Sequence, residues 1–550
     1  MTKLRYLPGL AVCALALAAC VRPAERLPIP SPSRGYVLIS LDALRPDHLG
    51  AYGYQRPTSP FLDTLAARGA VFERAVAQYP STLASHLTIF TGLYPQEHAV
   101  FRPERFLDEG IETLPERLLA RGFRTAGFTE GGFMTGAYGF ERGFEHFDDR
   151  RYREDTDVER TFDHGLRFLD SVEDDERFFL FLHTYSIHDP YTPPERYRGL
   201  FWEGEPPPGS FDSDGQNLRA VNRGELAVTP EIVDYFASQY DASIRYVDDV
   251  LAGFWARVEE LGLADEITLV VTSDHGEAFY EHGTLAHFQV YPEDLMVPLI
   301  VVHPGLAQGV RVPALVSLVD LAPSLYELMA VEPPPILSGR SLAPYLLSPE
   351  VRLGEEAYGE ALNRYTLRTL LREQDGTVYQ IVLIEPEAGR HGIWITRSVT
   401  FQPGTDQLDF EAYSFHEPRT LKVLTGGEEV ASVLLGTGGQ QVSVKLPPGP
   451  PLREVVLSTP DCVSPLELGM SDDARCLSFQ VRGLPLRRSE LYDLGADPGA
   501  KTDISKEQPD LHRMMLRKLL GYRFEPVTET LSHEMSDETR KTLRDLGYLR

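Results

Sequence analysis

Cysteine is scarce in this chain, which has only 4 cysteines among 550 residues. They are Cys13, Cys20, Cys462 and Cys476, so neither a CxxC pair nor a zinc-finger spacing occurs. This excludes a structural zinc site built on paired thiolates. Cys462 and Cys476 are close in sequence and, in an exported protein, could form a disulfide; two buried free thiols are the alternative.

Positive charge is also in short supply. Lysine and arginine number 53 against 81 acidic residues, which gives a formal net charge of −28. Nucleic-acid binding, which needs a basic footprint, is therefore excluded, and electrostatic docking on anionic lipid is disfavoured. An anionic substrate is not excluded, because a bound cation can reverse the local field. The oligomeric state does not follow from the sequence.

The N-terminal apolar run is short. It covers residues 7–19 after Lys3 and Arg5 and predicts a signal peptide over residues 1–19 rather than a membrane-spanning helix. It ends in Leu-Ala-Ala-Cys20, which resembles a bacterial lipobox and implies cleavage before Cys20 and acylation of its thiol. An ordinary signal peptide is the alternative. Residues 20–35 are rich in proline and predict a linker. We expect an exported lipoprotein, anchored in the membrane at the periplasmic face of the cell envelope.

Three short apolar runs, at residues 36–41, 178–182 and 267–272, are typical of strands buried on both faces. Helical patterns such as residues 232–261 lie between them, so the sequence predicts an α/β fold with a mostly parallel sheet flanked by helices. From residue 379 to 485, short alternating segments and Gly and Pro turns predict an inserted, sandwich-like all-β module. We expect residues 36–378 to form a catalytic domain that residues 486–550 complete.

Each of the three predicted strands is followed by a residue that can bind a metal ion. These residues are Asp42, His183 and Asp274, and His275 comes directly after the last of them. In open α/β sheets, sites form beyond the carboxyl ends of the strands. A lone aspartate at a strand end is more often a helix cap, but the coincidence of three favours a site. A carboxylate and a neutral imidazole suit Mn²⁺ or Zn²⁺, whereas Ca²⁺ prefers oxygen ligands alone.

Several motifs are similar to those of the sulfatase family in the alkaline-phosphatase-like superfamily. ISLDALRPDHLGAYGY resembles the first metal-binding segment of sulfatases, with Ala43 at the second aspartate position. STLASHLTIFTGLYP resembles the sulfatase signature Cys-x-Pro-Ser-Arg followed by Thr-Gly and Tyr-Pro. Thr82 then stands at the nucleophile position, and His86 replaces the arginine. A capped helix is the alternative reading of this segment. The resemblance covers residues 35–346 and resumes at residues 490–494.

The resemblance implies a divalent metal ion (Ca²⁺, Mn²⁺, Mg²⁺ or Zn²⁺) held by Asp42, Thr82, Asp274 and His275. Sulfatases oxidise a cysteine or serine to formylglycine, whose hydrate attacks sulfur. Thr82 cannot follow this route, because oxidation of its secondary alcohol would give a ketone. We therefore expect Thr82 to attack through its own oxygen.

The resemblance also implies roles for several histidines. His188 matches a histidine that contacts the substrate oxyanion, and His287 stands where sulfatases place a lysine, so it could donate a proton to the leaving oxygen. His86 is a third candidate catalytic residue, and His183 and His282 are candidate ligands of a second metal ion. A lone histidine is usually structural. The Gly-Lys-Trp-His-Leu motif of sulfatases is absent, and residues 127–132 stand in its place.

We expect an exported, metal-dependent hydrolase of sulfate or phosphate esters, with phosphate monoesters or diesters favoured by the chemistry of Thr82. The substrate would be a small-molecule or glycan ester. An arylsulfatase, a phosphoglycerol-type transferase and a catalytically inactive, glycan-binding scaffold are the alternatives.

Overall fold

The structure is a computed structural model that describes residues 32–150, 157–349, 351, 354–362, 365–386, 393–395, 398–401, 406–448, 455–460, 462–463, 478–482, 488–528 and 531–532. The expected signal peptide (1–19), Cys20 and most of the expected linker lie outside the described residues. Cys462 is disulfide-bonded, and its expected partner Cys476 also lies outside them. Among the described helices, none is long and apolar enough to cross a membrane.

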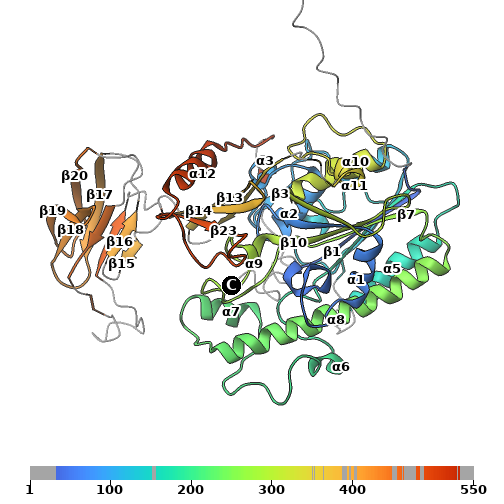
Figure 1. Cartoon of the computed structure of the whole chain (residues 1–550), viewed down its shortest axis with the longest axis horizontal. Coiled ribbons are helices and arrows are strands. Elements are labelled where there is room, and N and C mark those ends of the chain that lie inside the picture. Colours follow the sequence, from blue (N-terminus) through green and yellow to red (C-terminus); the bar gives the residue numbers. More distant parts are fainter. Residues whose placement is uncertain are drawn as a thin grey trace, which may run out of the picture.

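An 8-stranded sheet forms the centre of the large α/β part, with the order β11-β2-β10-β7-β1-β6-β4-β5 (Figure 1). All neighbouring strands run parallel except β10, which is antiparallel to β2 and β7. The strands are β1 (Gly35–Leu41), β2 (Ala70–Val76), β4 (Arg124–Phe128), β5 (His146–Asp148), β6 (Phe178–Thr184), β7 (Ile267–Thr272), β10 (Met296–Val302) and β11 (Val310–Ser317). This confirms the predicted α/β fold with a mostly parallel sheet.

Both faces of the central strands are buried, as the continuous apolar runs predict. In β1, Tyr36 and Leu38 belong to the hydrophobic core on one face of the sheet, whereas Val37 and Ile39 belong to the core on the other. This alternation follows from the strand period of two. The first core also includes side chains of α2 (Thr82–Thr91), α4 (Leu114–Ala120), α10 (Leu321–Leu328) and α11 (Ala343–Leu347). The second core also includes side chains of α1 (Pro60–Arg68), α5 (Asp157–Asp170), α7 (Gly215–Asn222) and α8 (Pro230–Glu260).

A separate antiparallel sheet joins the C-terminal segment to the α/β part. It consists of β12 (Glu356–Leu362), β13 (Tyr365–Gln374), β14 (Thr377–Pro386) and β23 (Arg488–Asp493), and α12 (Pro509–Gly521) packs on it. The expected domain boundary at residue 379 falls inside β14, which pairs with β13 and β23 along its length. The strand over residues 377–386 therefore pairs with this sheet and not with the module that follows it.

The inserted all-β module lies to the left in Figure 1. Its two 4-stranded antiparallel sheets have the orders β15-β22-β17-β20 and β16-β21-β18-β19. The strands are β15 (Ile393–Ile395), β16 (Ser398–Phe401), β17 (Gln407–Ser414), β18 (Arg419–Thr425), β19 (Glu428–Leu435), β20 (Gln440–Lys445), β21 (Val455–Ser458) and β22 (Phe479–Arg482). Alternate residues such as Leu408, Phe410 and Val423 form its core. Short elements complete the chain: α3 (Pro95–His98), α6 (Glu195–Arg198), α9 (Pro292–Leu295), β3 (Arg105–Phe106), β8 (Ala278–Phe279), β9 (Leu285–Ala286) and β24 (Leu531–Ser532).

Candidate metal centre and active site

Three polar residues meet at the carboxyl edge of the central sheet. Asp42 follows β1, His183 is the second-last residue of β6, and Asp274 follows β7. Because β6 and β7 flank β1 in parallel register, their ends are adjacent. One ligand atom from each of Asp42, Asp274 and His275 lies within 4.8 Å of the other two, and all three residues are buried. The structure thus brings together three of the four expected metal ligands.

The spacing of these atoms fits neighbours in one coordination sphere. His275 Nε2 lies 3.7 Å from Asp42 Oδ1 and 3.3 Å from Asp274 Oδ2. These separations exceed those of strong charge-assisted hydrogen bonds. Two ligands that are each about 2.1 Å from a tetrahedral ion lie roughly 3.4 Å apart. None of the three atoms has a hydrogen-bond partner among the described residues, and buried polar atoms of this kind normally have one.

The backbone holds His275 with Nε2 directed at the two carboxylates. Its Nδ1 lies 2.9 Å from the carbonyl oxygen of Gly276, so Nδ1 carries the proton and Nε2 has a free lone pair. Gly276 permits this turn, because a Cβ there would lie 2.0 Å from the carbonyl oxygen of Glu293. The Asp-His-Gly motif therefore combines two ligands with a residue that allows the close approach of another backbone segment.

Thr82 is the first residue of α2, after Ser81 at the N-cap. Its Oγ1 is buried and has no hydrogen-bond partner among the described residues. The first turn of α2 lies against the Asp274 segment, because Ser85 Oγ donates to the carbonyl oxygen of Asp274 at 2.6 Å. A buried hydroxyl without a partner is costly, so Thr82 Oγ1, like the three atoms of the metal-binding group, lacks within the described chain the partner that its burial calls for.

Both ring nitrogens of His86 have hydrogen-bond partners within the protein. Its Nδ1 lies 2.9 Å from the carbonyl oxygen of Thr82 and 3.6 Å from Asp274 Oδ2. Its Nε2 lies 2.8 Å from Ser40 Oγ in β1. Burial lowers the pKa of His86, which keeps the ring neutral. Both nitrogens are thus occupied, and the ring, expected to be catalytic, joins the first turn of α2 to β1.

The centre contains two buried carboxylates, those of Asp42 and Asp274. Burial, followed by repulsion from Asp274, raises the pKa of Asp42 to about 7. Burial opposes ionisation of Asp274 as well, but the neighbouring His275 and His86 outweigh it and lower the pKa of that carboxyl. Burial lowers the pKa of His275, so the imidazole is suited to bind a metal ion. The two carboxylates and the neutral imidazole of Asp42, Asp274 and His275 fit a divalent cation such as Mn²⁺ or Zn²⁺.

Two further histidines, both expected at the site, lie beside the centre. The ring of His287 is 4.1 Å from that of His275, and the ring of His188 is 4.9 Å from that of His287. Burial would lower the pKa of His188, but the carboxylate of Asp189, 2.8 Å from Nδ1, raises it well above its usual value. Burial and the neighbouring His188 lower the pKa of His287 to about 3. His188 therefore supplies positive charge, whereas His287 is neutral and can only form hydrogen bonds.

His183 and His282, the candidate ligands of a second metal ion, have other partners. His183 Nε2 lies 3.0 Å from Asp42 Oδ2. His282 Nδ1 lies 2.5 Å from Glu293 Oε1, its Nε2 lies 2.9 Å from the carbonyl oxygen of Ala500, and its ring stacks on another side chain. Neither belongs to the metal-binding group found among the described residues. His282 thus connects the loop between β8 and β9 to the C-terminal segment.

Sequence reasoning missed Glu277. This glutamate is completely buried, neither carboxylate oxygen has a hydrogen-bond partner among the described residues, and burial raises its pKa to about 8. Its Oε1 lies 3.7 Å from Nδ1 of His287. Arg45 Nη1 donates to the backbone carbonyl of Glu277 at 2.8 Å. The signal in the sequence was its place directly after Asp-His-Gly, the motif that supplies two of the three ligand atoms.

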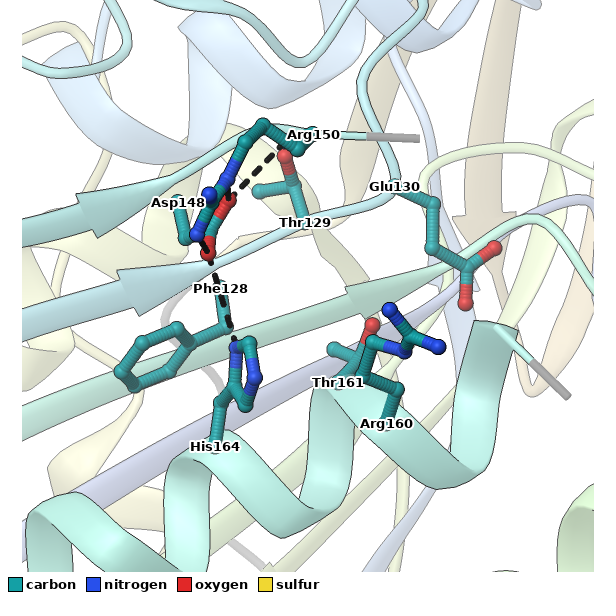
Figure 2. Close-up of a pocket in the computed structure, with 8 residues that line it drawn as sticks. All are labelled: Phe128, Thr129, Glu130, Asp148, Arg150, Arg160, Thr161 and His164. Carbon is teal, nitrogen blue, oxygen red and sulfur yellow. Dashed lines mark hydrogen bonds and ion pairs between the residues drawn. The ribbon is translucent and has the colours of Figure 1, made fainter. Parts of the chain in front are cut away.

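The segment that replaces the missing Gly-Lys-Trp-His-Leu motif lies at the end of β4. Glu130 Oε2 accepts a hydrogen bond from the backbone N–H of Tyr185 at 2.9 Å, and the ring of Tyr185 lies 4.6 Å from that of His183. Glu130 also lines a small pocket with Arg150 and Arg160, which Figure 2 shows between β4, β5 and α5. Its volume of about 10 Å³ has room for a single water molecule. Glu130 thus helps to fix the backbone of Tyr185, whose ring packs against His183.

The geometry agrees with a comparison of the sequence with known families. The sulfatase family model matches residues 34–331, which is more than half of the chain. The chain belongs to the sulfatase family. Arylsulfatase K of Rattus norvegicus is 23% identical to this sulfatase-family protein over 355 residues, or 56% of the chain and 61% of the relative. An arylsulfatase of Clostridium perfringens is 23% identical over 401 residues, or 60% of the chain and 82% of the relative. The chain thus spans about three fifths of the rat protein.

Solved structures share the fold of this sulfatase-family protein. One of them is the structure of a protein in complex with its substrate D-glucosamine-2-N,6-O-disulfate, with a TM-score of 0.59 at 16% identity. The alignment covers 94% of this chain and 98% of the chain in that structure. The phosphonate monoester hydrolase of Agrobacterium radiobacter has a TM-score of 0.56 at 17% identity and covers 92% of this chain and 100% of its own. At these identities the likeness establishes the fold alone.

Proposed function

We propose that this protein hydrolyses phosphate or sulfate esters at a divalent metal ion, with Thr82 as the nucleophile. One observation carries the proposal. Asp42 Oδ1, Thr82 Oγ1, Asp274 Oδ2 and His275 Nε2 are all buried without hydrogen-bond partners among the described residues. The atoms from Asp42, Asp274 and His275 lie within 4.8 Å of one another at the end of the sheet, and Thr82 begins α2, whose first turn contacts Asp274. A bound cation would compensate for the desolvation of these groups. The ester would belong to a small molecule or a glycan.

A divalent ion bound there would neutralise charge on the ester and lower the pKa of a hydroxyl beside it. Thr82, having lost its proton to solvent, forms a bond from Oγ1 to phosphorus as the bond from phosphorus to the leaving oxygen breaks. The N-terminus of α2 and the positive charge of His188 stabilise the anion. His287, which is neutral, is placed to donate a hydrogen bond. Water then hydrolyses the phosphoryl-Thr82 ester and restores the hydroxyl group.

The chemistry of threonine favours phosphate monoesters and diesters. An aldehyde hydrate can expel sulfate by collapsing to the aldehyde, but an ester of the threonine hydroxyl has no such route and depends on attack by water. Sulfate ester hydrolysis is the second candidate, because both arylsulfatases named above are relatives. Transfer to an acceptor hydroxyl instead of water would make the protein a phosphoglycerol-type transferase.

The test uses the full chain, loaded separately with Mn²⁺, Zn²⁺, Mg²⁺ and Ca²⁺. Turnover of 4-nitrophenyl sulfate, 4-nitrophenyl phosphate and bis(4-nitrophenyl) phosphate is compared at equal concentration. We expect one of the phosphorus esters to be hydrolysed fastest. A preference for the sulfate by orders of magnitude would overturn the phosphate assignment. Absence of both metal binding and turnover would favour the inactive, glycan-binding scaffold.

We also propose that the protein is exported and anchored by a lipid on Cys20. The support is the N-terminal sequence, with its basic residues, short apolar run and Leu-Ala-Ala-Cys ending. The Cys20→Ser variant should move from the membrane fraction to the soluble fraction and lose labelling by a radioactive fatty acid. Equal membrane association of the variant would contradict the anchor.

A further inference from the structure

A groove of about 750 Å³ lies on the surface near the loop that follows β1. The loop contributes residues 47 and 52–56, α8 contributes Asp234 and Ala237, and the segment after α6 contributes Trp202. The side chains that define the groove are Asp47, Tyr52, Tyr54, Arg56, Trp202 and Asp234. Its volume is in the range of sites that bind small ligands. None of these residues belongs to the metal centre.

The aromatic side chains of the groove are held in place by their polar ends. Tyr54 donates its hydroxyl hydrogen to Asp241 Oδ2 at 2.6 Å, and the hydroxyl oxygen of Tyr52 accepts from the backbone N–H of Leu299 at 2.8 Å. Trp202 Nε1 donates to the carbonyl of Glu205 at 3.2 Å. Their polar atoms are therefore satisfied within the protein, and the half-buried rings offer apolar surface to the groove. A surface fixed in this way loses little entropy on binding.

The charged groups decide what kind of ligand fits. The side chain of Asp47 is 62% exposed, although its two oxygens accept from Arg45 Nε at 3.0 Å and Nη2 at 2.7 Å. Asp234 lies on the same groove and adds a second carboxylate. The one positive charge in the defining set is Arg56, whose Nη1 already donates to the buried Asp241 at 2.7 Å. Carboxylates accept hydrogen bonds from hydroxyl groups but repel sulfate and phosphate. Aromatic faces beside acceptor groups match the C–H surface and hydroxyl groups of an uncharged sugar.

We propose that this groove binds an uncharged stretch of an oligosaccharide, separately from the metal centre. Trp202 and Tyr54 would pack against sugar rings, and Asp47 and Asp234 would accept hydrogen bonds from sugar hydroxyls. Arg45 connects the two regions, because it donates to Asp47 at 2.7 Å and to the carbonyl of Glu277 at 2.8 Å. The inference does not depend on the proposed hydrolysis, since the groove would bind sugar whether or not the metal centre turns over an ester.

The test is calorimetric titration of the full chain with neutral hexasaccharides: cellohexaose, mannohexaose and chitohexaose. A sulfated carrageenan hexasaccharide is titrated in parallel. We expect at least one neutral hexasaccharide to bind and the Trp202→Ala variant to weaken that binding at least tenfold. Leu200→Ala is the matched control, because Leu200 is 50% exposed, two residues away and outside the groove lining. It should bind like the wild type.

Three results would overturn the proposal. These are the failure of all three neutral hexasaccharides to bind, binding that Trp202→Ala leaves unchanged, and tighter binding of the sulfated hexasaccharide through Trp202. Turnover of the 4-nitrophenyl esters is measured in each variant and should be unchanged. If the wild type turns over none of these esters, the proposed hydrolysis fails while the saccharide titrations still decide the groove.

Discussion

His183 Nε2 lies 3.0 Å from Oδ2 of Asp42, and this contact leaves Oδ1 of Asp42 as the oxygen nearest to His275. The two residues stand at the ends of neighbouring strands, so the contact depends on the parallel pairing of β1 with β6. Partners of this kind orient metal ligands and contribute to affinity. We therefore expect His183 to position Asp42 for the candidate metal centre.

Replacement of His183 should weaken metal binding. We expect His183→Ala to lower the affinity for Mn²⁺ or Zn²⁺ by about 10–100-fold, because Asp42 loses the group that orients it. Titration of the metal-free protein followed by calorimetry measures the effect. His183→Gln, which retains a hydrogen-bond donor, should recover part of the affinity. Equal affinities for all three proteins would contradict the positioning role.

Removal of the Thr82 hydroxyl should abolish turnover while the fold and most of the bound metal are retained. We expect Thr82→Val, which has the same shape, to lower kcat by at least about 10³-fold. Bound metal, measured by elemental analysis, should persist because Asp42, Asp274 and His275 remain. The melting temperature should hardly change, since Oγ1 makes no hydrogen bond within the described chain. Undiminished turnover in Thr82→Val would refute the nucleophile.

A divalent ion should stabilise the folded protein. Two buried carboxylates face the same centre, and an ion that binds only the folded state at 100 times its Kd adds about 2.7 kcal/mol. We expect a chelator to lower the melting temperature and added Mn²⁺ or Zn²⁺ to restore it. The Asp274→Asn variant should show a much smaller shift. An identical melting temperature with and without metal would argue against the site.

The stability of the protein should depend on the protonation of Asp248. This residue of α8 accepts hydrogen bonds from the backbone N–H groups of Phe61 and Leu62, each at 2.8 Å, and burial raises its pKa to about 7. Because the unfolded chain releases this proton near pH 4, the folded state binds more protons between about pH 4 and 7, and stability falls as the pH rises through this window.

The corresponding measurement is thermal unfolding at several pH values. The melting temperature of the wild type should decrease from pH 5 to pH 8, and that of Asp248→Asn should decrease less, because its amide does not titrate. Parallel curves for the two proteins would show that the pKa of Asp248 is not raised.

Glu490 should be important for stability. Its Oε2 accepts hydrogen bonds from the hydroxyl groups of Tyr291 at 2.8 Å and Tyr492 at 2.6 Å, all in the interior. We expect Glu490→Ala to lower the free energy of unfolding by about 2–4 kcal/mol, because two buried hydroxyls lose their acceptor. Glu490→Gln retains a carbonyl acceptor and should cost less. Urea unfolding measures both, and equal losses would contradict the hydrogen-bonding explanation.

Local sequence was sufficient for the strands and for the residues at their ends. The runs at residues 36–41 and 267–272 match β1 and β7 within one residue, and the helix expected at residues 232–261 is α8, Pro230–Glu260. Strand ends follow from short-range hydrophobic patterns. The expected start of the all-β module at residue 379 was less successful, because an alternating pattern does not show which sheet a strand such as β14 joins.

The sequence by itself determined the α/β class and the identity of Asp42, Asp274 and His275 as residues at the edge of a sheet, since each of these depends on neighbours within a few positions. Only the tertiary structure decided what the histidines and the buried glutamate do. His86 and His282 have both nitrogens bonded to distant groups, whereas Glu277 is buried without a hydrogen-bond partner among the described residues. The physical reason is that hydrogen bonding and burial depend on segments far apart in the chain, which come together only when the sheet and its helices pack.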